Sequence, residues 1–254
     1  MSLFFDSHAH INDPVLLDKR EDIFSAMRRE QVSGLMNVGC CEESSRDCVA
    51  LAEKYPFIYA AIGSHPDDAA SVTPELIDRY RALAEHPKVK AIGEIGLDYH
   101  YESVPREIQQ QAFRMQLALA GDLGLPVIVH EREAHDDGLR IVREFPELKG
   151  VFHCFSGSWE FAKVLLKEGW YLGFTGVLTF KNARKAVEVA ARAPLDRILI
   201  ETDCPFMAPE PFRGRPSNPS QVPLVAAKLA EIRGISVEEA AAATRENALR
   251  LFRI

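Results

Sequence analysis

Six residues of the kinds that bind divalent metals stand at or just beyond the ends of short apolar segments. A histidine pair lies beyond the segment LFFD, and a carboxylate closes the segment RILIETD. The full set is His8, His10, Glu94, His130, His153 and Asp203. Imidazole nitrogens and carboxylate oxygens, without thiolates, suit Zn2+, Mn2+, Co2+ or Mg2+. The residue types therefore predict a metal-dependent hydrolase.

The spacing of these residues indicates how they share metal ions. Side chains at i and i+2 of an extended segment point to the same side, so His8 and His10 can bind one ion together. Six protein ligands exceed the three that a single catalytic zinc usually has. We therefore expect two ions, about 3.5–4 Å apart, with Glu94 bridging them.

The same residues also allow a purely structural interpretation. His130 and His153, taken singly, could be hydrogen-bonded core histidines. Glu94, a carboxylate at the end of a buried segment, could instead form an ion pair with Arg132 or Lys181. The position of all six residues at strand ends favours the metal site over these alternatives.

Short apolar segments alternate with longer amphipathic segments along the whole chain. The expected strands are Leu3–Asp6, Gly34–Val38, Phe57–Ile62, Val89–Glu94, Val127–His130, Gly150–His153, Tyr171–Phe174 and Ile198–Glu201. The expected helices are Leu16–Glu30, Glu43–Lys54, Pro74–Glu85, Pro105–Leu123, Asp137–Phe145, Trp159–Glu168, Asn182–Ala193, Val222–Arg233 and Val237–Leu251. Eight repeats of this alternation predict an α/β protein whose parallel sheet closes into a (β/α)8 TIM barrel with extra C-terminal helices. We expect one domain over residues 1–254, with the site at the C-terminal ends of the strands.

Composition limits the classes of function. A chain of 254 residues with 47% hydrophobic content has the size of one such barrel. The net charge of −7, from 37 acidic and 30 basic residues, argues against a protein that grips duplex DNA non-specifically. The five cysteines contain no C-x-x-C pattern, which favours a reducing cytoplasm. A secretory leader and a membrane-spanning segment are not expected, because no apolar run is long enough.

The expected ligands belong to a longer series of motifs. In chain order these are DSHAH, GSHP, GEIGLDY, PVIVHER, HCFSG, FTGVLTFKN, ETDCP and RGRPSNP. Over residues 4–252 the series resembles the TatD family of metal-dependent deoxyribonucleases, which belongs to the amidohydrolase-like barrels. The ligand assignment that this resemblance implies is His8, His10 and Asp203 for one metal, His130 and His153 for the other, and Glu94 as the bridge.

The resemblance also implies an activity, the Mg2+- or Mn2+-dependent hydrolysis of DNA, often from the 3′ end. The chain departs from the family pattern at Ser64, where Val or Ile is common, and at Cys204, where Ser is common. Neither residue is an expected ligand, so these departures leave the expected mechanism unchanged.

Several cations and aromatic residues near the expected rim could contact a substrate. His65, in GSHP, could bind a phosphate or protonate a leaving oxygen, or it could be a structural histidine. Arg213 and Arg215, in the loop after the last strand, could bind phosphate, or they could be solvated loop residues. Lys181 is a further cation that favours an anionic substrate. The aromatic residues that could stack on unpaired bases, or pack loops against the rim, are Tyr99, Phe155, Trp159 and Phe180.

The expected chemistry is a two-metal phosphodiesterase reaction. Two divalent ions, Mg2+, Mn2+ or Zn2+, would neutralise the charge that develops at phosphorus, and zinc-like ions would lower the pKa of a bound water toward about 7. Asp203, whose alternative role is a helix cap, would orient the water and accept its proton, with Glu94 joining the two ions. His65 or a second water would protonate the departing oxygen.

Two other functions remain open at this level. An amidase, lactonase or deacylase could use the same metal-bound hydroxide against a carbonyl carbon, although the rim cations favour an anionic substrate. A catalytically idle metal-binding protein is the second alternative, and the complete ligand set argues against it. DNA is the expected partner, held transiently through few phosphates, with no membrane and no obligate protein partner.

Overall fold

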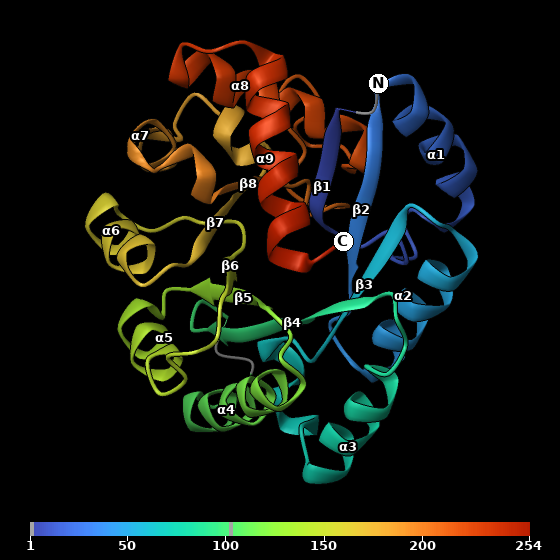
Figure 1. The fold of residues 1–254 in the computed structure, drawn as a ribbon, viewed down its shortest axis with the longest axis vertical. Coiled ribbons are helices and arrows are strands. Elements are labelled where there is room, and N and C mark those ends of the chain that lie inside the picture. Colours follow the sequence, from blue (N-terminus) through green and yellow to red (C-terminus); the bar gives the residue numbers. More distant parts are fainter. Residues whose placement is uncertain (1–2, 102–103) are drawn as a thin grey trace. The chain divides into compact units, whose positions relative to one another are not determined.

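Strands and helices alternate through the chain (Figure 1), of which the computed structural model describes residues 3–101 and 104–254. The strands are β1 (Phe4–Ala9), β2 (Val32–Val38), β3 (Ile58–Ile62), β4 (Val89–Asp98), β5 (Val127–Arg132), β6 (Gly150–Phe152), β7 (Tyr171–Phe174) and β8 (Ile198–Ile200). The α-helices are α1 (Arg20–Arg29), α2 (Glu42–Lys54), α3 (Pro74–Leu83), α4 (Arg106–Leu123), α5 (His135–Val142), α6 (Trp159–Lys167), α7 (Arg184–Arg192), α8 (Val222–Arg233) and α9 (Val237–Phe252). Among the described helices, none combines the length and the hydrophobicity that crossing a bilayer requires.

The eight strands belong to one sheet in chain order, from β1 to β8. The pairs β1–β2, β3–β4, β4–β5, β5–β6 and β7–β8 are all parallel. Parallel strands joined in sequence by helices are the arrangement of a (β/α)8 barrel. The predicted fold class is therefore confirmed, and the two terminal helices, α8 and α9, follow the last strand as expected.

The chain divides into two compact units. One unit combines Cys154–Arg250 with the residues up to Asn37. The other combines Val38–His153 with the last residues, Leu251–Ile254.

Apolar strand residues form the core within each unit. In the unit that contains β4 and β5, helix α4 packs against β4 (Figure 1), and its Phe113 and Leu117 are buried. Strands of parallel sheets are covered on both faces, which explains why β6 and the first half of β5 read as continuous apolar runs and not as alternating ones. Thr73 caps α3, since its hydroxyl accepts a hydrogen bond from the amide of Leu76 at 3.3 Å.

Strand β4 differs most from its prediction, because it continues four residues beyond Glu94 and ends at Asp98. The expected strand stopped two residues before Gly96, and the structure shows why a glycine lies inside it. Gly96 pairs with His130 of β5 and has a φ of +148°, and a Cβ there would lie 1.9 Å from the His130 carbonyl oxygen. Only glycine permits this approach of the two backbones. The prediction that Glu94 ends its strand was therefore wrong.

Candidate metal centre

Three predicted ligands lie together in the unit that contains β1 and β8. The His8 and His10 Nε2 atoms are 3.1 Å apart, which confirms that the two rings share one side of the chain. Asp203 Oδ1 lies 3.4 Å from His10 Nε2 and 3.7 Å from His8 Nε2. All three residues are buried. We call these residues the His8–Asp203 cluster.

Reciprocal backbone bonds hold this cluster at the ends of β1 and β8. The amide of Asp203 donates to the carbonyl of His8 at 2.9 Å, and the amide of His10 donates to the carbonyl of Cys204 at 3.0 Å. Asp203 has a φ of +53°, a left-handed conformation that is uncommon for a residue other than glycine. Such conformations persist where the surroundings fix them and are frequent at functional sites.

Asp6 supports the same cluster from within β1, although the sequence analysis did not single it out. Its carboxylate accepts hydrogen bonds from the amide and the hydroxyl of Thr202, at 2.9 and 2.5 Å, and from the amide of His8 at 3.3 Å. Asp6 thus joins β1 to the residues that lead to Asp203. Complete burial outweighs these hydrogen bonds and raises the pKa of the Asp6 carboxyl to about 8.

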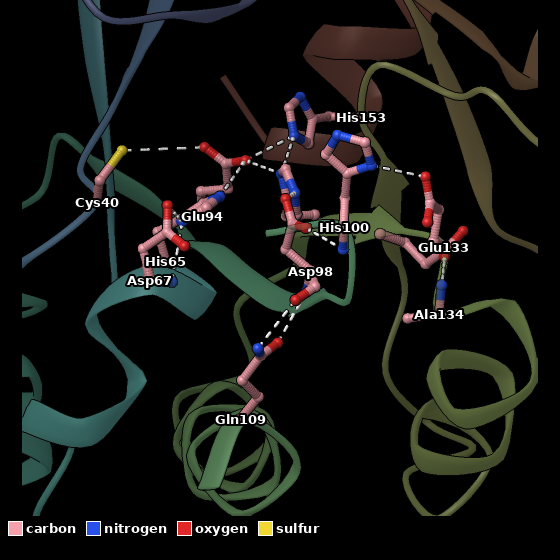
Figure 2. Close-up of polar contacts among 12 residues, drawn as sticks. Cys40, His65, Asp67, Glu94, Asp98, His100, Gln109, Glu133, Ala134 and His153 are labelled. Atoms are coloured by element: carbon pink, nitrogen blue, oxygen red, sulfur yellow. Dashed lines mark hydrogen bonds and ion pairs between the residues drawn. The ribbon is translucent and has the colours of Figure 1, made fainter. Parts of the chain in front are cut away.

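The other three predicted ligands lie together in the unit that contains β4 and β5. Figure 2 shows the carboxylate of Glu94 directed at His153, and Glu94 Oε1 is 2.6 Å from His153 Nε2. The same oxygen is 2.6 Å from His130 Nδ1, and the two imidazole nitrogens are 3.2 Å apart. We call these residues the Glu94–His153 cluster. Arg132, the alternative partner of Glu94, instead lies over the ring of Tyr101 at 4.8 Å.

The donor atoms of each cluster fit a divalent metal ion. Ligands that are bound about 2.0–2.1 Å from one ion lie about 3 Å from each other. The three closest donor atoms of the Glu94–His153 cluster lie 2.6–3.2 Å apart, and those of the His8–Asp203 cluster 3.1–3.7 Å apart. Nitrogen and carboxylate oxygen donors without thiolates select for ions such as Zn2+, Mn2+ or Mg2+. Each cluster could therefore hold a metal.

Asp98, at the end of β4, fixes the orientation of the His130 ring. Asp98 Oδ2 lies 3.1 Å from His130 Nε2, and Gln109 holds both the amide and the carbonyl of Asp98 (Figure 2), at 2.8 and 2.9 Å. An ionised carboxylate only accepts hydrogen bonds, so the shared proton belongs to His130 Nε2. Nδ1 is then the ring nitrogen left for a metal. Sequence reasoning missed Asp98, because it ended the strand at Glu94.

We expect Asp98→Asn to weaken metal binding by about 10- to 100-fold without unfolding the protein, as is typical for carboxylates that orient a ligating histidine. The metal dissociation constant, measured by competition with a chromogenic chelator, checks this. The matched control is Asp122→Asn, which changes an exposed carboxylate that pairs with Arg81 on the surface. Equal affinities in both variants would show that Asp98 does not position His130.

Metal binding by the Glu94–His153 cluster should also release protons. Burial opposes a charge on His130, but hydrogen bonds with Asp98 and Glu94 outweigh it and raise the pKa of His130 to about 10. The ring therefore keeps a proton through the neutral range, and a metal must displace it from Nδ1. Metal affinity should then rise about tenfold per pH unit for each proton released, between about pH 7 and 9. Calorimetry in buffers of different ionisation enthalpy measures the released protons, and a value of zero contradicts the prediction.

The raised pKa of His130 also affects the stability of the metal-free protein, which should fall as the pH rises. Because the pKa of His130 rises from 6.5 to about 10, protonation stabilises the folded protein. The contribution of His130 protonation to the free energy of unfolding is fully present below about pH 6.5 and is lost as the pH rises through about 10.

His65 lies beside the Glu94–His153 cluster. Its ring centroid is 4.4 Å from that of His130, and its Nε2 is 3.9 Å from Glu94 Oε1. Its Nδ1 accepts a hydrogen bond from the amide of Asp67 at 3.2 Å, which requires an unprotonated Nδ1. In the neutral ring the proton is therefore on Nε2, the nitrogen nearer to the cluster.

The residues expected to contact substrate divide into exposed cations and covered aromatics. Lys181, Arg213 and Arg215 are all exposed. Tyr99 and Phe155 are only 7% and 6% exposed, so they cannot act as open stacking surfaces. The hydroxyl of Tyr99 bonds to Asp137, and Phe155 stacks on Phe161. These two aromatic residues therefore pack the loops against the rim. The rings of Trp159 and Phe180 are partly exposed, and an arginine guanidinium lies over each of them.

Solved structures of similar fold include close and distant proteins. A TatD homolog from Escherichia coli K12, YjjV, superposes with a TM-score of 0.94 at 33% identity, covering 100% of this chain and 99% of that one. A phosphotriesterase homology protein from Escherichia coli, with phosphate in its active site, superposes with a TM-score of 0.70 at 14% identity, covering 99% of both chains. At that identity the second likeness concerns the fold alone.

Sequence relatives give the family. A Bacillus subtilis protein described as an uncharacterized metal-dependent hydrolase, YabD, is 44% identical over 254 residues, which is 99% of this chain and 100% of the relative. A protein of Erwinia tasmaniensis named 3′-5′ ssDNA/RNA exonuclease TatD is 34% identical, covering 98% of this chain and 100% of the relative. The model of the family described as TatD related DNase matches residues 5–253. The chain therefore belongs to the TatD family of metal-dependent hydrolases.

Proposed function

We propose that this chain is a two-metal phosphodiesterase that removes nucleotides from the 3′ ends of single-stranded or frayed DNA. The observation that carries the proposal is the pair of imidazole–carboxylate clusters, whose donor atoms lie close enough to bind metal ions. Membership of the TatD family and the name of the Erwinia exonuclease support a polynucleotide as the substrate.

The proposed ligand assignment uses all six predicted residues. The residues that would hold the ions are His8, His10 and Asp203 for one, His130 and His153 for the other, and Glu94 as the bridge. Mg2+, Mn2+ and Zn2+ all suit these donors. When bound, such ions lower the pKa of a water molecule and neutralise charge that develops on a phosphate.

Asp203 and His65 are the residues that we assign to proton transfer. Asp203 offers a carboxylate to orient the attacking water and to accept its proton. His65 carries its proton on Nε2 when neutral, because the Asp67 amide occupies Nδ1, and this proton is available to the departing sugar oxygen. Neither imidazole of the His8–Asp203 cluster can do this work while it binds a metal.

The charge of the protein indicates how a DNA strand would be held. With a net charge of −7, few phosphates can be bound, and Lys181, Arg213 and Arg215 are the cations we assign to them. The salt dependence of binding should therefore correspond to about one to three neutralised phosphates, instead of the 6–10 of a protein that grips duplex DNA. We also propose a cytoplasmic location, which the five free cysteines support. We propose no obligate protein partner.

The test is a time course on end-labelled single-stranded DNA and on a covalently closed single-stranded circle of the same sequence. Protein stripped of metal and reloaded with Mg2+ or Mn2+ should release mononucleotides from the linear strand and leave the circle intact. Blunt duplex should be cut more slowly, since its terminal phosphates are held in a stacked helix.

Two results would contradict the proposal in different ways. Rapid cutting of the circle would show that no end is needed and would exclude an exonuclease. Turnover of lactone or amide substrates without any DNA cleavage would show that the metals serve carbonyl chemistry instead.

A further inference from the structure

The loop that follows β8, residues 204–218, exposes an unusual amount of apolar surface. Phe206 is 56% exposed, Met207 40% and Phe212 36%. Buried positions are the usual place for such side chains, and exposed apolar clusters commonly mark binding surfaces. Their exposure has no signal in the sequence, and none of them is a predicted metal ligand.

Phe206 is attached directly to the His8–Asp203 cluster. It lies three residues after Asp203, and its amide donates a hydrogen bond to the Asp203 carbonyl at 2.9 Å. The amide of Ser217 donates to the carbonyl of Pro205 at 2.9 Å, so the two ends of the loop meet beside the cluster. The exposed residue Phe206 therefore lies close to Asp203 along the chain, at the start of the loop.

The loop is held in place by the segment after β7. The amide of Glu210 donates to the hydroxyl of Thr179 at 2.9 Å. A Cβ on Gly176 would lie 2.1 Å from the carbonyl oxygen of Met207, so the two backbones touch there. A surface fixed in this way loses little conformational entropy when a ligand binds.

The same loop carries cations that the described residues do not neutralise. Arg213 and Arg215 are exposed and form no ion pair in the described part of the chain, and Glu210 is the single carboxylate of the loop. Among the described residues, arginines that do pair with carboxylates include Arg46, Arg79, Arg81, Arg114, Arg140, Arg192 and Arg197. The guanidinium of Arg213 lies 4.3 Å from the centre of the Phe180 ring, which leaves it available to an anion.

We infer that Phe206 is the stacking surface for the base of a nucleotide bound at the His8–Asp203 cluster. Phe212, Arg213 and Arg215 receive the next nucleotide of the same unpaired strand, through its base and its phosphate. Aromatic rings stack on any base, and guanidinium groups bind phosphates, so a loop that exposes both Phe and Arg side chains matches a single strand better than an apolar partner surface. This inference rests on the proposed function and names the part of the chain that selects unpaired ends.

The test measures binding of a short single-stranded oligodeoxynucleotide in Ca2+, with 2-aminopurine as its 3′-terminal base. Phe206→Ala should weaken binding by about 5- to 150-fold, as is typical for the loss of one stacked base. Phe206→Trp should restore the affinity, whereas Phe206→Leu, which is apolar but not aromatic, should not. The matched control is Ile108→Ala, which truncates an apolar side chain that is 39% exposed on α4.

A second oligonucleotide separates stacking from other effects of the substitution. When the 3′-terminal nucleotide is abasic, Phe206→Ala and the unaltered protein should bind equally, because no base remains to stack. Equal losses on the abasic and normal strands would overturn the inference. So would a dimer, detected by sedimentation, that Phe206→Ala dissociates, since the loop would then join two copies of the chain.

Loss of the stacking role and loss of the proposed nuclease function would give different results. Normal DNA cleavage with unchanged binding by Phe206→Ala overturns the stacking role alone. Failure of the unaltered protein to bind or cleave any DNA overturns the proposed function and the stacking role together.

Discussion

Replacing His8 and His10 together with alanine should remove one metal ion per chain and nearly all hydrolytic activity, by a factor of at least about a thousand. Their Nε2 atoms lie 3.1 Å apart and close to Asp203, so the substitution leaves one carboxylate where three ligands stood. Several kcal/mol of charge stabilisation by a metal correspond to rate losses of this size. Metal content per chain and turnover on single-stranded DNA are the two measurements.

The fold should survive this substitution with a lower melting temperature. His8 is fully buried in β1, so its truncation leaves a small cavity, yet the apolar core of the strands is untouched. The matched control removes two histidines outside the clusters, His86 and His100, and should leave metal content and turnover unchanged. An unaltered metal count in the His8 and His10 variant would refute the ligand assignment.

Glu94→Gln should be the most damaging single substitution for turnover, again by about a thousandfold or more. Glu94 Oε1 lies 2.6 Å from both His130 and His153, and an amide cannot replace the negative charge that these groups and a metal require. If Glu94 joins the two ions, metal content should fall by more than one ion per chain. Circular dichroism should remain that of the unaltered protein.

The control for Glu94 is another carboxylate that is paired with a histidine. Glu131, on the neighbouring strand β5, has a side chain that is only 5% exposed and pairs with His135. Glu131→Gln should lower stability slightly and leave metal content unchanged. Two bound metals and normal turnover in Glu94→Gln would exclude Glu94 as the bridging ligand.

The strands, and the histidines and carboxylates that gather at or near their ends, could be predicted from the sequence because both follow local rules. Apolar runs bounded by Gly, Pro or Asp mark the strands, and the i, i+2 spacing places His8 and His10 on one side. Two of the three members of the Glu94–His153 cluster lie on neighbouring strands, His130 within β5 and His153 just beyond the end of β6. Such local patterns suffice here because neighbouring strands of a (β/α)8 barrel also follow one another along the chain.

The residues that support the ligands could not be predicted in the same way. Asp98 was missed because Gly96 resembles a strand end, and only the register of β4 and β5 shows that the strand continues. Asp6 reads as an ordinary boundary residue until Thr202, 196 positions away, is seen to donate to it. The exposure of Phe206 and the burial of Tyr99 depend on loop packing, for which a sequence has no periodic signal.

Gly96 has a consequence for how this protein tolerates sequence change. It has no side chain, binds nothing and transfers no proton, yet any Cβ at this position would collide with the backbone of a ligand-bearing strand. A saturation library scored for metal loading should therefore rank position 96 with the ligands themselves, and alanine there should fare no better than a bulky residue. Redesign of the metal centre would have to treat this small gap between two strands as a fixed part of the scaffold.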